Sequence, residues 1–494
     1  MKIINKITIV FSLTLSFFVL QGCDLDVDNL NEPDRDRVLG DPSEAVTLLD
    51  NSAISFFSNL LGRSRNYDHL ADQFITCSGS SWQVNREPRE RLTNDIGGTF
   101  ERLHERDWKA FYEMIITAND ILIRVDTWES ESDAYRNSAK ASALLLKGLA
   151  TGYAGVIYKE AIIVEASEIP LTIENIAVSD YNEVINKAIE YLEEAKAIYT
   201  NNPDLEWSSL PNIELSSVKV VQLINTYAAK FLLGKARNND QFKVLDFSKI
   251  QSYLDNSIES TVTAIGTTQL YGSHQYSASR IRRNQFSYSA DQKIPWLLSG
   301  KAVPTKKGVD DSTPITSIDK RAELYFVYKE QTRFRYSERD PSLYSNYGNI
   351  RFRQEDSDGK GKDRQEYPAN ILHVEEIPVL KAEVAYGLGN YALAESLLNS
   401  SRRVTVGEMP LLTGADPVKI ADALFYENSI ELNLMGKGIQ WMFMRRWDLL
   451  QEGTMLHMPI PAQESQLMNV DIITIGGQGT GDGIDSAKGD NSWR

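Results

Sequence analysis

Residues Leu380–Leu397, with the sequence LKAEVAYGLGNYALAESL, contain the pattern that decides the fold. Ala385 and Tyr386 are predicted to end one helix, and Gly389-Asn390 is predicted to reverse the chain. Ala394 then faces back across the turn. Because two helices pack closely only where small residues meet, the two alanines predict a tight antiparallel helix pair.

This pair resembles a tetratricopeptide turn, and similar close-packing stripes occur at 145–156 and 227–231. Helical periodicity dominates the chain, and strand-like alternation is scarce. The helical patterns cover about 99–125, 136–159, 178–199, 216–236, 247–261, 370–387, 390–403 and 417–436. Asp41-Pro42-Ser43-Glu44 has the residues of a helix start. No strict repeat is visible, so we expect a mostly α fold of irregular helix pairs. It is interrupted by irregular stretches at about 77–98 and 265–368, and a Gly- and Asp-rich tail from Gly476 is expected to loop over the surface.

The charge of the chain excludes one class of function. Its 494 residues include 52 Lys+Arg and 68 Asp+Glu, a formal net charge of −16. Proteins that bind nucleic acid need a basic surface to displace phosphate counterions, and this chain has no Lys/Arg-rich block. Nucleic acid is therefore not an expected partner.

The first residues indicate export. A basic start, Met1–Lys6, precedes the apolar run Ile7–Leu20, which is too short to cross a bilayer comfortably and fits a signal peptide. Leu20-Gln21-Gly22-Cys23 resembles a bacterial lipobox. We therefore expect residues 1–22 to be a lipoprotein signal peptide and Cys23 to be acylated, for example with palmitate. The alternative is an ordinary signal peptide followed by a chance cysteine.

The segment after Cys23 is acidic. Residues 23–40 begin Cys-Asp-Leu-Asp-Val-Asp, which resembles the surface-export signal of Bacteroidetes lipoproteins. A solvated acidic tether is a compatible interpretation. Two or more acyl chains anchor a protein stably, so the membrane would be contacted through the lipid alone. With Cys23 acylated, Cys77 has no disulfide partner, and we interpret it as structural.

No pattern in the sequence predicts catalysis or a resident metal. The five histidines are scattered, and there is no nucleophile elbow and no phosphate-binding loop. The glycine-rich run Gly476–Gly481 opens no predicted helix, which argues against dinucleotide binding. Residues Asp356–Asp363 look like a calcium loop, but lysines occupy ligand positions and the final Glu is missing. We favour a surface turn over a structural calcium site, and expect no cofactor.

Three C-terminal segments resemble the SusD/RagB family of Bacteroidetes nutrient-binding lipoproteins. They are 371–383, 426–448 and 457–464, and their order and spacing also match. Asn428 departs from the family pattern, as do Met442–Met444, and Pro378 is expected to kink the first segment's helix. The second segment contains six residues to which we assign structural roles: Glu427, Glu431, Trp441, Arg445, Arg446 and Trp447.

The two glutamates of this segment lie one helical turn apart. Glu427 and Glu431 are predicted to pair with Arg445 or Arg446, which would tie the last long helix to the segment that follows. Ligand contact is the alternative role for these four residues.

The resemblance implies a SusD-like fold for residues 41–494 as a single domain. It would have about four tetratricopeptide-like helix pairs as a scaffold and a loop-rich, ligand-facing part. It also implies a protein on the outer face of the outer membrane that is not an enzyme. Such a protein hands oligosaccharides or other nutrients to a SusC-like TonB-dependent transporter.

Candidate ligand residues are aromatic or planar polar side chains in the two irregular stretches, because sugars bind aromatic faces and planar polar groups. The first stretch contains Trp82, Asn85 and Arg89, and Trp82 and Asn85 occupy a place similar to the family's N-terminal sugar contacts. The second contains Trp296, Tyr344 and Tyr347. Alternatively, these aromatics pack the loops onto the scaffold.

Two other classes of function remain open at the level of sequence. A secreted glycoside hydrolase would need two carboxyl groups about 5–9.5 Å apart, which a sequence cannot reveal. A helical-repeat scaffold that binds only protein would need no small ligand at all.

Overall fold

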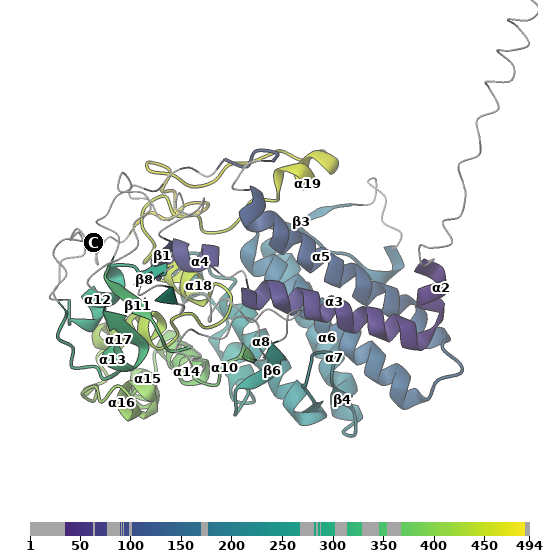
Figure 1. The fold of residues 1–494 in the computed structure, drawn as a ribbon, viewed down its shortest axis with the longest axis horizontal. Coiled ribbons are helices and arrows are strands. Elements are labelled where there is room, and N and C mark those ends of the chain that lie inside the picture. Colours follow the sequence, from purple (N-terminus) through teal and green to yellow (C-terminus); the bar gives the residue numbers. More distant parts are fainter. Residues whose placement is uncertain are drawn as a thin grey trace, which may run out of the picture.

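The computed structural model describes residues 35–62, 65–76, 89, 91, 93–97, 101–168, 176–266, 281–282, 285–286, 288–301, 314–328, 345–352 and 367–489. Helices dominate this part of the chain, as predicted (Figure 1). The helices are α2 (Arg35–Gly40), α3 (Pro42–Gly62), α4 (Arg65–Leu70), α5 (Glu101–Arg124), α6 (Asp133–Ile157), α7 (Tyr181–Asn201), α8 (Ser217–Leu233), α9 (Asn239–Lys243), α10 (Phe247–Leu254), α12 (Lys293–Leu298), α13 (Arg321–Tyr325), α14 (Glu376–Gly387), α15 (Tyr391–Ser400), α16 (Arg402–Thr405), α17 (Pro417–Ile430), α18 (Ile439–Arg446) and α19 (Ala462–Leu467).

The described strands are short and form two-stranded antiparallel pairs. The pairs are β1 (Phe74–Thr76) with β9 (Tyr288–Ala290), β2 (Glu160–Ile162) with β3 (Val178–Asp180), β4 (Glu206–Trp207) with β5 (Leu215–Ser216), β6 (Val262–Gly266) with β12 (Tyr367–Leu372), β7 (Ile281–Arg282) with β8 (Gln285–Phe286), and β10 (Phe326–Tyr328) with β11 (Tyr347–Asn349). They join loops to the helical scaffold.

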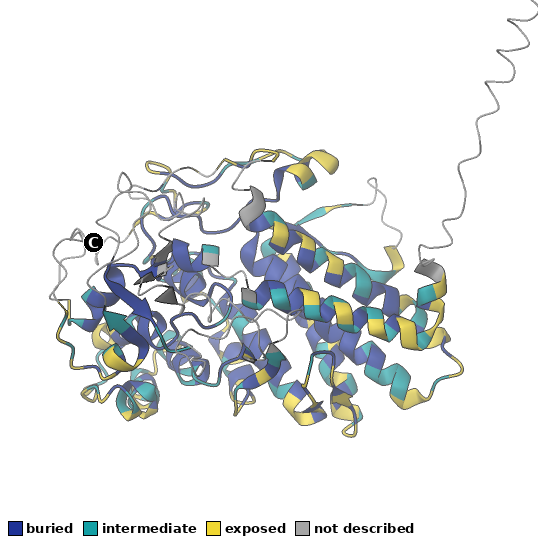
Figure 2. Cartoon of the chain, viewed as in Figure 1, coloured by how far each residue is buried: buried dark blue, intermediate teal, exposed yellow. Residues whose placement is uncertain are grey.

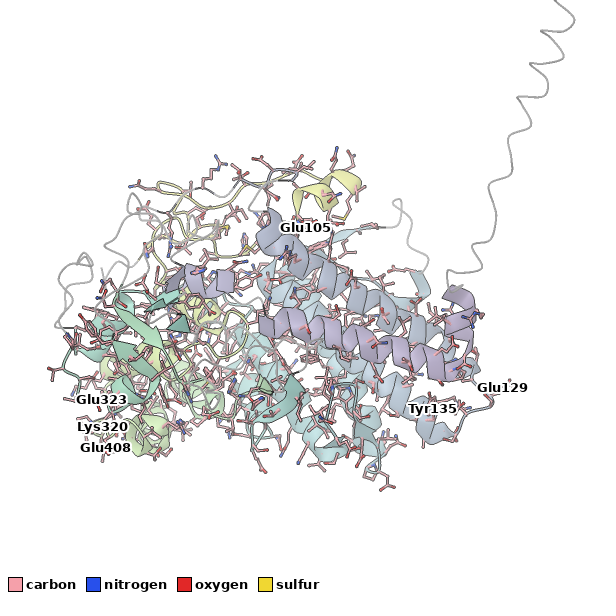
Figure 3. The ribbon with its side chains drawn as sticks, viewed as in Figure 1. Glu105, Glu129, Tyr135, Lys320, Glu323 and Glu408 are labelled. Carbon is pink, nitrogen blue, oxygen red and sulfur yellow. The ribbon has the colours of Figure 1, made fainter. Side chains whose placement is uncertain are left out.

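The long helices form one continuous array. Helices α3, α5, α6, α7, α8, α10, α14 and α15 each pack against the next, and α17 packs on both α14 and α15. Figure 2 shows buried residues filling the interior between these helices, while the exposed residues line their outer faces. Tyr135, labelled near Glu129 in Figure 3, joins the start of α6 to the start of α3 through a hydrogen bond from its hydroxyl to the carbonyl oxygen of Pro42 (3.2 Å).

Small residues set the helix spacing, as the sequence predicted. A Cβ added to Gly152 on α6 would lie 2.1 Å from the Phe231 ring of α8, so only glycine fits there. In the α14–α15 pair, Ala385 and Ala394 are buried, and Gly389 has a φ of +72°, which favours glycine. The Asn390 side chain accepts a hydrogen bond from the backbone of Leu393 and caps α15. The predicted helix pair is confirmed.

The first residues of α3 and α14 show how each helix begins. Asp41 caps α3 by accepting hydrogen bonds from the backbone of Ser43 and Glu44, as its sequence predicts. The kink predicted at Pro378 is wrong. Helix α14 begins only at Glu376, so Pro378 lies in the first turn, where its missing N–H and fixed φ are tolerated. The residues before it form β12 instead.

From Gly476 to Gly489, the last described residue, the C-terminal segment is irregular and contains no helix. The expectation that it loops over the surface is wrong at Ser486 and Ala487, which are buried. Asp485 forms an ion pair with Lys159 (2.8 Å) and accepts a hydrogen bond from His457 (2.9 Å), which fastens the segment to the core. Within the described ranges, no helix is both long and apolar enough to cross a membrane.

Candidate ligand-binding site

The structure places the strand that precedes the first predicted ligand-facing stretch beside a strand of the second. Strand β1 ends at Thr76, directly before the first stretch, and Thr76 pairs with Tyr288 of β9 in the second. Ser345, which follows Tyr344 in sequence, donates a hydrogen bond from Oγ to the carbonyl oxygen of Ala290 in β9 (2.7 Å). Figure 1 shows β1, β11 and α12 at one end of the molecule, apart from α5, α6 and α7.

Arg89 fastens the middle of the first stretch, after Trp82 and Asn85 in sequence. Its guanidinium forms a buried ion pair with Asp72 (2.7 Å) and donates to Oγ1 of Thr454 (3.0 Å). Asp72 lies four residues before Thr76, where the same stretch begins. The segment between Thr76 and Arg89 therefore leaves and rejoins the scaffold at neighbouring points. Arg89 acts here as an anchor, and its contact with a ligand stays a prediction.

The chain beyond Arg89 is tied to one of the three family-like segments. Asn94 donates from Nδ2 to the carbonyl oxygen of Ile460 (2.7 Å), and its Oδ1 accepts from the backbone N–H of Ala462 (3.1 Å). The Asn94 side chain is buried. The prolines on either side of Ile460 keep the chain extended, so its backbone groups are available to this side chain.

Trp296 and Tyr347 lie on elements that pack against β9, and the two side chains differ in exposure. Trp296 on α12 is half-buried, and the Lys301 ammonium lies 5.4 Å from its ring centroid. Tyr347 is buried, its hydroxyl accepts from the backbone N–H of Ile315 (2.7 Å), and its ring packs edge-on against Tyr328. These contacts pack Tyr347 against Ile315 and Tyr328 of the same irregular stretch. Ligand contact by either residue stays a prediction.

The remaining predicted positions lie outside the described residues. They are Cys23, Cys77, Trp82, Asn85, Tyr344 and the calcium-like segment 356–363.

The second stretch is seated by a buried lysine. Lys293, the first residue of α12, donates from Nζ to the carbonyl oxygen of Ala71 (2.5 Å), which directly follows α4. Its backbone N–H donates to Asp291 (2.8 Å), and the backbone N–H of Asp291 donates to the carbonyl oxygen of Gln73 (3.2 Å). The end of α4, β1 and α12 are therefore joined at one junction.

A buried charge network anchors the remainder of the second stretch to α17. Arg321, which is fully buried, forms a two-pronged ion pair with Glu427 (2.6 and 2.9 Å) and contacts Glu431 (3.0 Å) and Asp319 (2.8 Å). Paired, hydrogen-bonded charges can be buried at acceptable cost, whereas removing one partner leaves an uncompensated charge. Figure 3 shows Lys320, the neighbour of Arg321, on the outer surface close to Glu323 and Glu408.

Glu431 receives two further arginines. Arg351 contacts its carboxylate (2.9 Å), and Arg402 approaches the same oxygen (2.8 Å). Burial by itself would raise the pKa of Glu431, but the charges of Arg351, Arg321 and Arg402 together outweigh it and lower the pKa below its usual value. Three carboxylates, including Asp319 and Glu427, thus face three guanidinium groups.

The predicted pairing of Glu427 or Glu431 with Arg445 or Arg446 is wrong. Arg446 instead forms a two-pronged ion pair with Glu383 of α14 (2.6 Å for each prong), and Trp447 donates from Nε1 to the same carboxylate (2.7 Å). These two residues lie at the end of α18, and their side chains reach Glu383 of α14, although α18 itself packs on α17.

Arg445 has no carboxylate partner in the described chain. It donates to the carbonyl oxygens of Leu456 and Gly234, at the carboxyl end of α8, and lies against the ring of Trp441. A cation is favourable there because carbonyl groups at the end of a helix carry partial negative charge. All six residues of the segment are buried or half-buried within the scaffold.

The arginines that hold the loops were not predicted. Arg321 and Arg351 lie far from α17 in sequence, and no local pattern marks them or Arg402. The available signal was the spacing of Glu427 and Glu431, one helical turn apart. Two buried glutamates need cationic partners, but their spacing does not identify those partners. Among the described residues, no group of three or more His, Cys, Asp or Glu side chains is placed to hold a metal ion.

Comparisons with known proteins identify the fold. No protein-family model and no curated protein sequence matches the chain. Among solved structures, it is similar to a SusD-like carbohydrate binding protein from Bacteroides vulgatus, with a TM-score of 0.57, 16% identity, and 82% of this chain and 83% of that one covered. A SusD superfamily protein from Parabacteroides distasonis matches with a TM-score of 0.55 and 12% identity, covering 86% and 97%. A structure described as containing a xylogluco-oligosaccharide matches with a TM-score of 0.53 and 14% identity, covering 82% of each chain.

The chain therefore has the SusD-like fold, as its sequence predicted. At these identities the likeness establishes the fold alone, because one fold can serve several functions.

Proposed function

We propose that this chain is a cell-surface lipoprotein that binds a glycan or another nutrient without catalysis. It would deliver that ligand to a partner SusC-like TonB-dependent transporter in the outer membrane. The observation that carries the proposal is the junction at β1, β9 and Ser345, where the chain that leads into the first stretch meets described parts of the second in a SusD-like fold.

The neighbours in structure support the class of ligand. One is described as a carbohydrate binding protein, and another as containing a xylogluco-oligosaccharide. The sequence of the gathered stretches offers what a sugar needs, since aromatic rings contact its C–H faces and planar polar groups bind its hydroxyls. Trp82, Asn85, Trp296 and Tyr344 are the side chains that we assign to this role.

Arg89 and Tyr347 support the site in a different way. Both are buried and held by the scaffold. We propose that they position the ligand-binding stretches, because a binding side chain is held in place only when the chain around it is anchored.

Acylation of Cys23 would keep the protein at the outer membrane, with the acidic segment that follows it as the tether; residues 35–40 of the predicted tether instead form α2, which packs on α3. Two or more acyl chains give an effectively stable anchor. The lipid would be its only contact with the membrane.

The test is to titrate the chain from residue 24 onward, without its lipid, with oligosaccharides of xyloglucan, starch, xylan and mannan by calorimetry. The proposal expects saturable binding of at least one oligosaccharide and no shortened product after long incubation. Release of cleaved glycan would favour a hydrolase. Binding to no nutrient, together with no transporter co-purifying from detergent-solubilised membranes, would contradict the proposal.

A further inference from the structure

A groove lies on the helical scaffold, away from the loop junction. Helices α7, α8 and α10 enclose a groove of about 780 Å³. Figure 1 shows these helices together in the helical half of the molecule, whereas β1 and α12 lie at the other end. The volume falls in the range of pockets that hold small organic ligands, about 300–1,000 Å³.

The walls of the groove are held together across α8. Tyr253 of α10 donates from its hydroxyl to Oε1 of Glu193 on α7 (2.7 Å), and Lys196 forms an ion pair with the same carboxylate (3.2 Å). The Lys196 ammonium also lies 5.2 Å from the Tyr253 ring centroid. The groove is therefore preformed by contacts between its own walls, so that little ordering is needed when a ligand enters.

One buried polar atom of a residue that lines the groove lacks a partner among the described residues. Asn225, which lines the groove on α8, is 3% exposed and donates from Nδ2 to the carbonyl oxygen of Asn256 (3.0 Å). Its Oδ1 has no hydrogen-bond partner within the described chain. An unsatisfied buried acceptor is costly, and a hydroxyl donor brought into the groove would satisfy it.

The rest of the lining is mixed in character. Val218, 67% exposed, and Val221 form a short apolar strip one turn apart on α8, beside Gln222. Carboxylates and lysines both occur on the rim, and Lys196 is already paired with Glu193. A surface with nearly balanced charge, amide groups and an apolar strip suits a neutral ligand with hydroxyls and C–H faces better than it suits an ion.

We propose that this groove is a second saccharide-binding site, which takes a neutral oligosaccharide independently of the loop junction. The inference rests on the proposed glycan-binding function. A second site on the scaffold would lengthen the residence time of a glycan on the protein, because a glycan bound at one site meets the other at high effective concentration.

The experiment uses a matched pair of variants. Val218→Trp places a large side chain at the groove, and Val244→Trp does the same at an exposed valine in the turn after α9, outside the groove lining. Both valines are exposed, so both variants should fold, which circular dichroism would verify. The chain from residue 24 onward is titrated with xyloglucan, starch, xylan and mannan oligosaccharides, and hydrogen exchange of peptides from α7, α8 and α10 is followed at saturation.

We expect two oligosaccharides per wild-type chain, one per Val218→Trp chain, two per Val244→Trp chain, and slower exchange of the groove peptides. If the wild-type chain and both variants each bind one oligosaccharide, and the exchange of these peptides is unchanged, the second site is overturned and the proposed function stays intact. No binding of any oligosaccharide would overturn both. Protection of the groove by casein-derived peptides, and not by oligosaccharides, would overturn the saccharide assignment.

Discussion

Arg321 and Glu427 form a fully buried, two-pronged ion pair, with Nη1 to Oε2 at 2.6 Å and Nη2 to Oε1 at 2.9 Å. The pair joins a loop-bearing segment to α17. It shows how this fold holds its irregular part, because long-range charge pairs fasten the loops where short strands alone would give little stability.

Replacing Arg321 with Met should destabilise the protein strongly. The change leaves Glu427 and Glu431 buried next to each other with fewer cations, which typically costs about 3–5 kcal/mol. Urea unfolding followed by circular dichroism would measure the loss. Lys320→Met is the control, because Lys320 is exposed one residue earlier, and its cost should stay within about 0.5 kcal/mol. Equal effects of the two changes would contradict the anchoring role of Arg321.

Replacing Arg89 with Met should lower both stability and ligand affinity. The variant leaves Asp72 buried without its cation and releases the end of the stretch that contains Trp82 and Asn85. Arg89→Lys keeps the charge but loses the fork of donors, so it should restore the stability only in part. Calorimetric titration with the bound oligosaccharide and thermal unfolding check the two effects. An Arg89→Met chain that is destabilised but binds with unchanged affinity would show that Arg89 does not position the site.

Replacing Gly152 with Ala should destabilise the helical array. The new Cβ would lie 2.1 Å from the Phe231 ring, and overpacking of this kind typically costs about 1–3 kcal/mol. Phe231→Leu in the same chain should remove the clash, so the double variant should be more stable than the sum of the single changes predicts. A double-mutant cycle in urea measures this coupling. Additive effects would mean that α6 and α8 are not held at this spacing by the glycine.

Stability should fall as the pH drops below about 6.5, the ordinary pKa of histidine. Burial, with the nearby Arg351 and Lys230, lowers the pKa of His373 to about 3. Burial also lowers the pKa of His457 to about 4, even though its hydrogen bond to Asp485 acts in the opposite direction. Each histidine stays neutral when folded and takes up a proton when unfolded. The contribution of these two histidines to the free energy of unfolding is therefore complete well above pH 6.5. It is lost progressively as the pH falls towards their folded pKa values.

As the pH falls from 6.5 towards 5, the slope should approach about 1.4 kcal/mol per pH unit for each of the two histidines. Urea unfolding at pH 7.5, 6.0 and 5.0 measures it. His373→Gln removes one of the two groups and should make the slope shallower. A free energy of unfolding that does not change over this range would show that the histidines are not buried as neutral groups.

The parts of this fold that were predictable are local in sequence. The α14–α15 pair and the Gly152 stripe were predicted correctly because the residues that decide them lie within one or two helical turns. The Pro378 kink was wrong because the start of the helix was placed several residues too early. Helix boundaries are set partly by tertiary contacts, here by the pairing of β12 with β6.

The parts that were not predictable depend on contacts between distant residues. Strands of three residues, such as β1 and β9, are too short to give a periodic signal, so the meeting of the two irregular stretches could not be deduced. The acidic positions of α17 were recognised as structural, yet their partner, Arg321, lies more than one hundred residues away in an irregular stretch. Nearby arginines were assigned in its place.

The most direct test of the proposed function is the affinity of the Trp82→Ala chain for the oligosaccharide that the wild-type protein binds best. Truncating an aromatic anchor in a binding site typically costs about 2 kcal/mol or more, so the change should weaken loop-site binding by at least about tenfold. Tyr391→Ala on α15, which removes a half-buried aromatic from the scaffold, should leave this affinity unchanged. Unchanged affinity in Trp82→Ala and in matching variants of Asn85, Trp296 and Tyr344 would contradict the assignment of the loop junction as the nutrient-binding site.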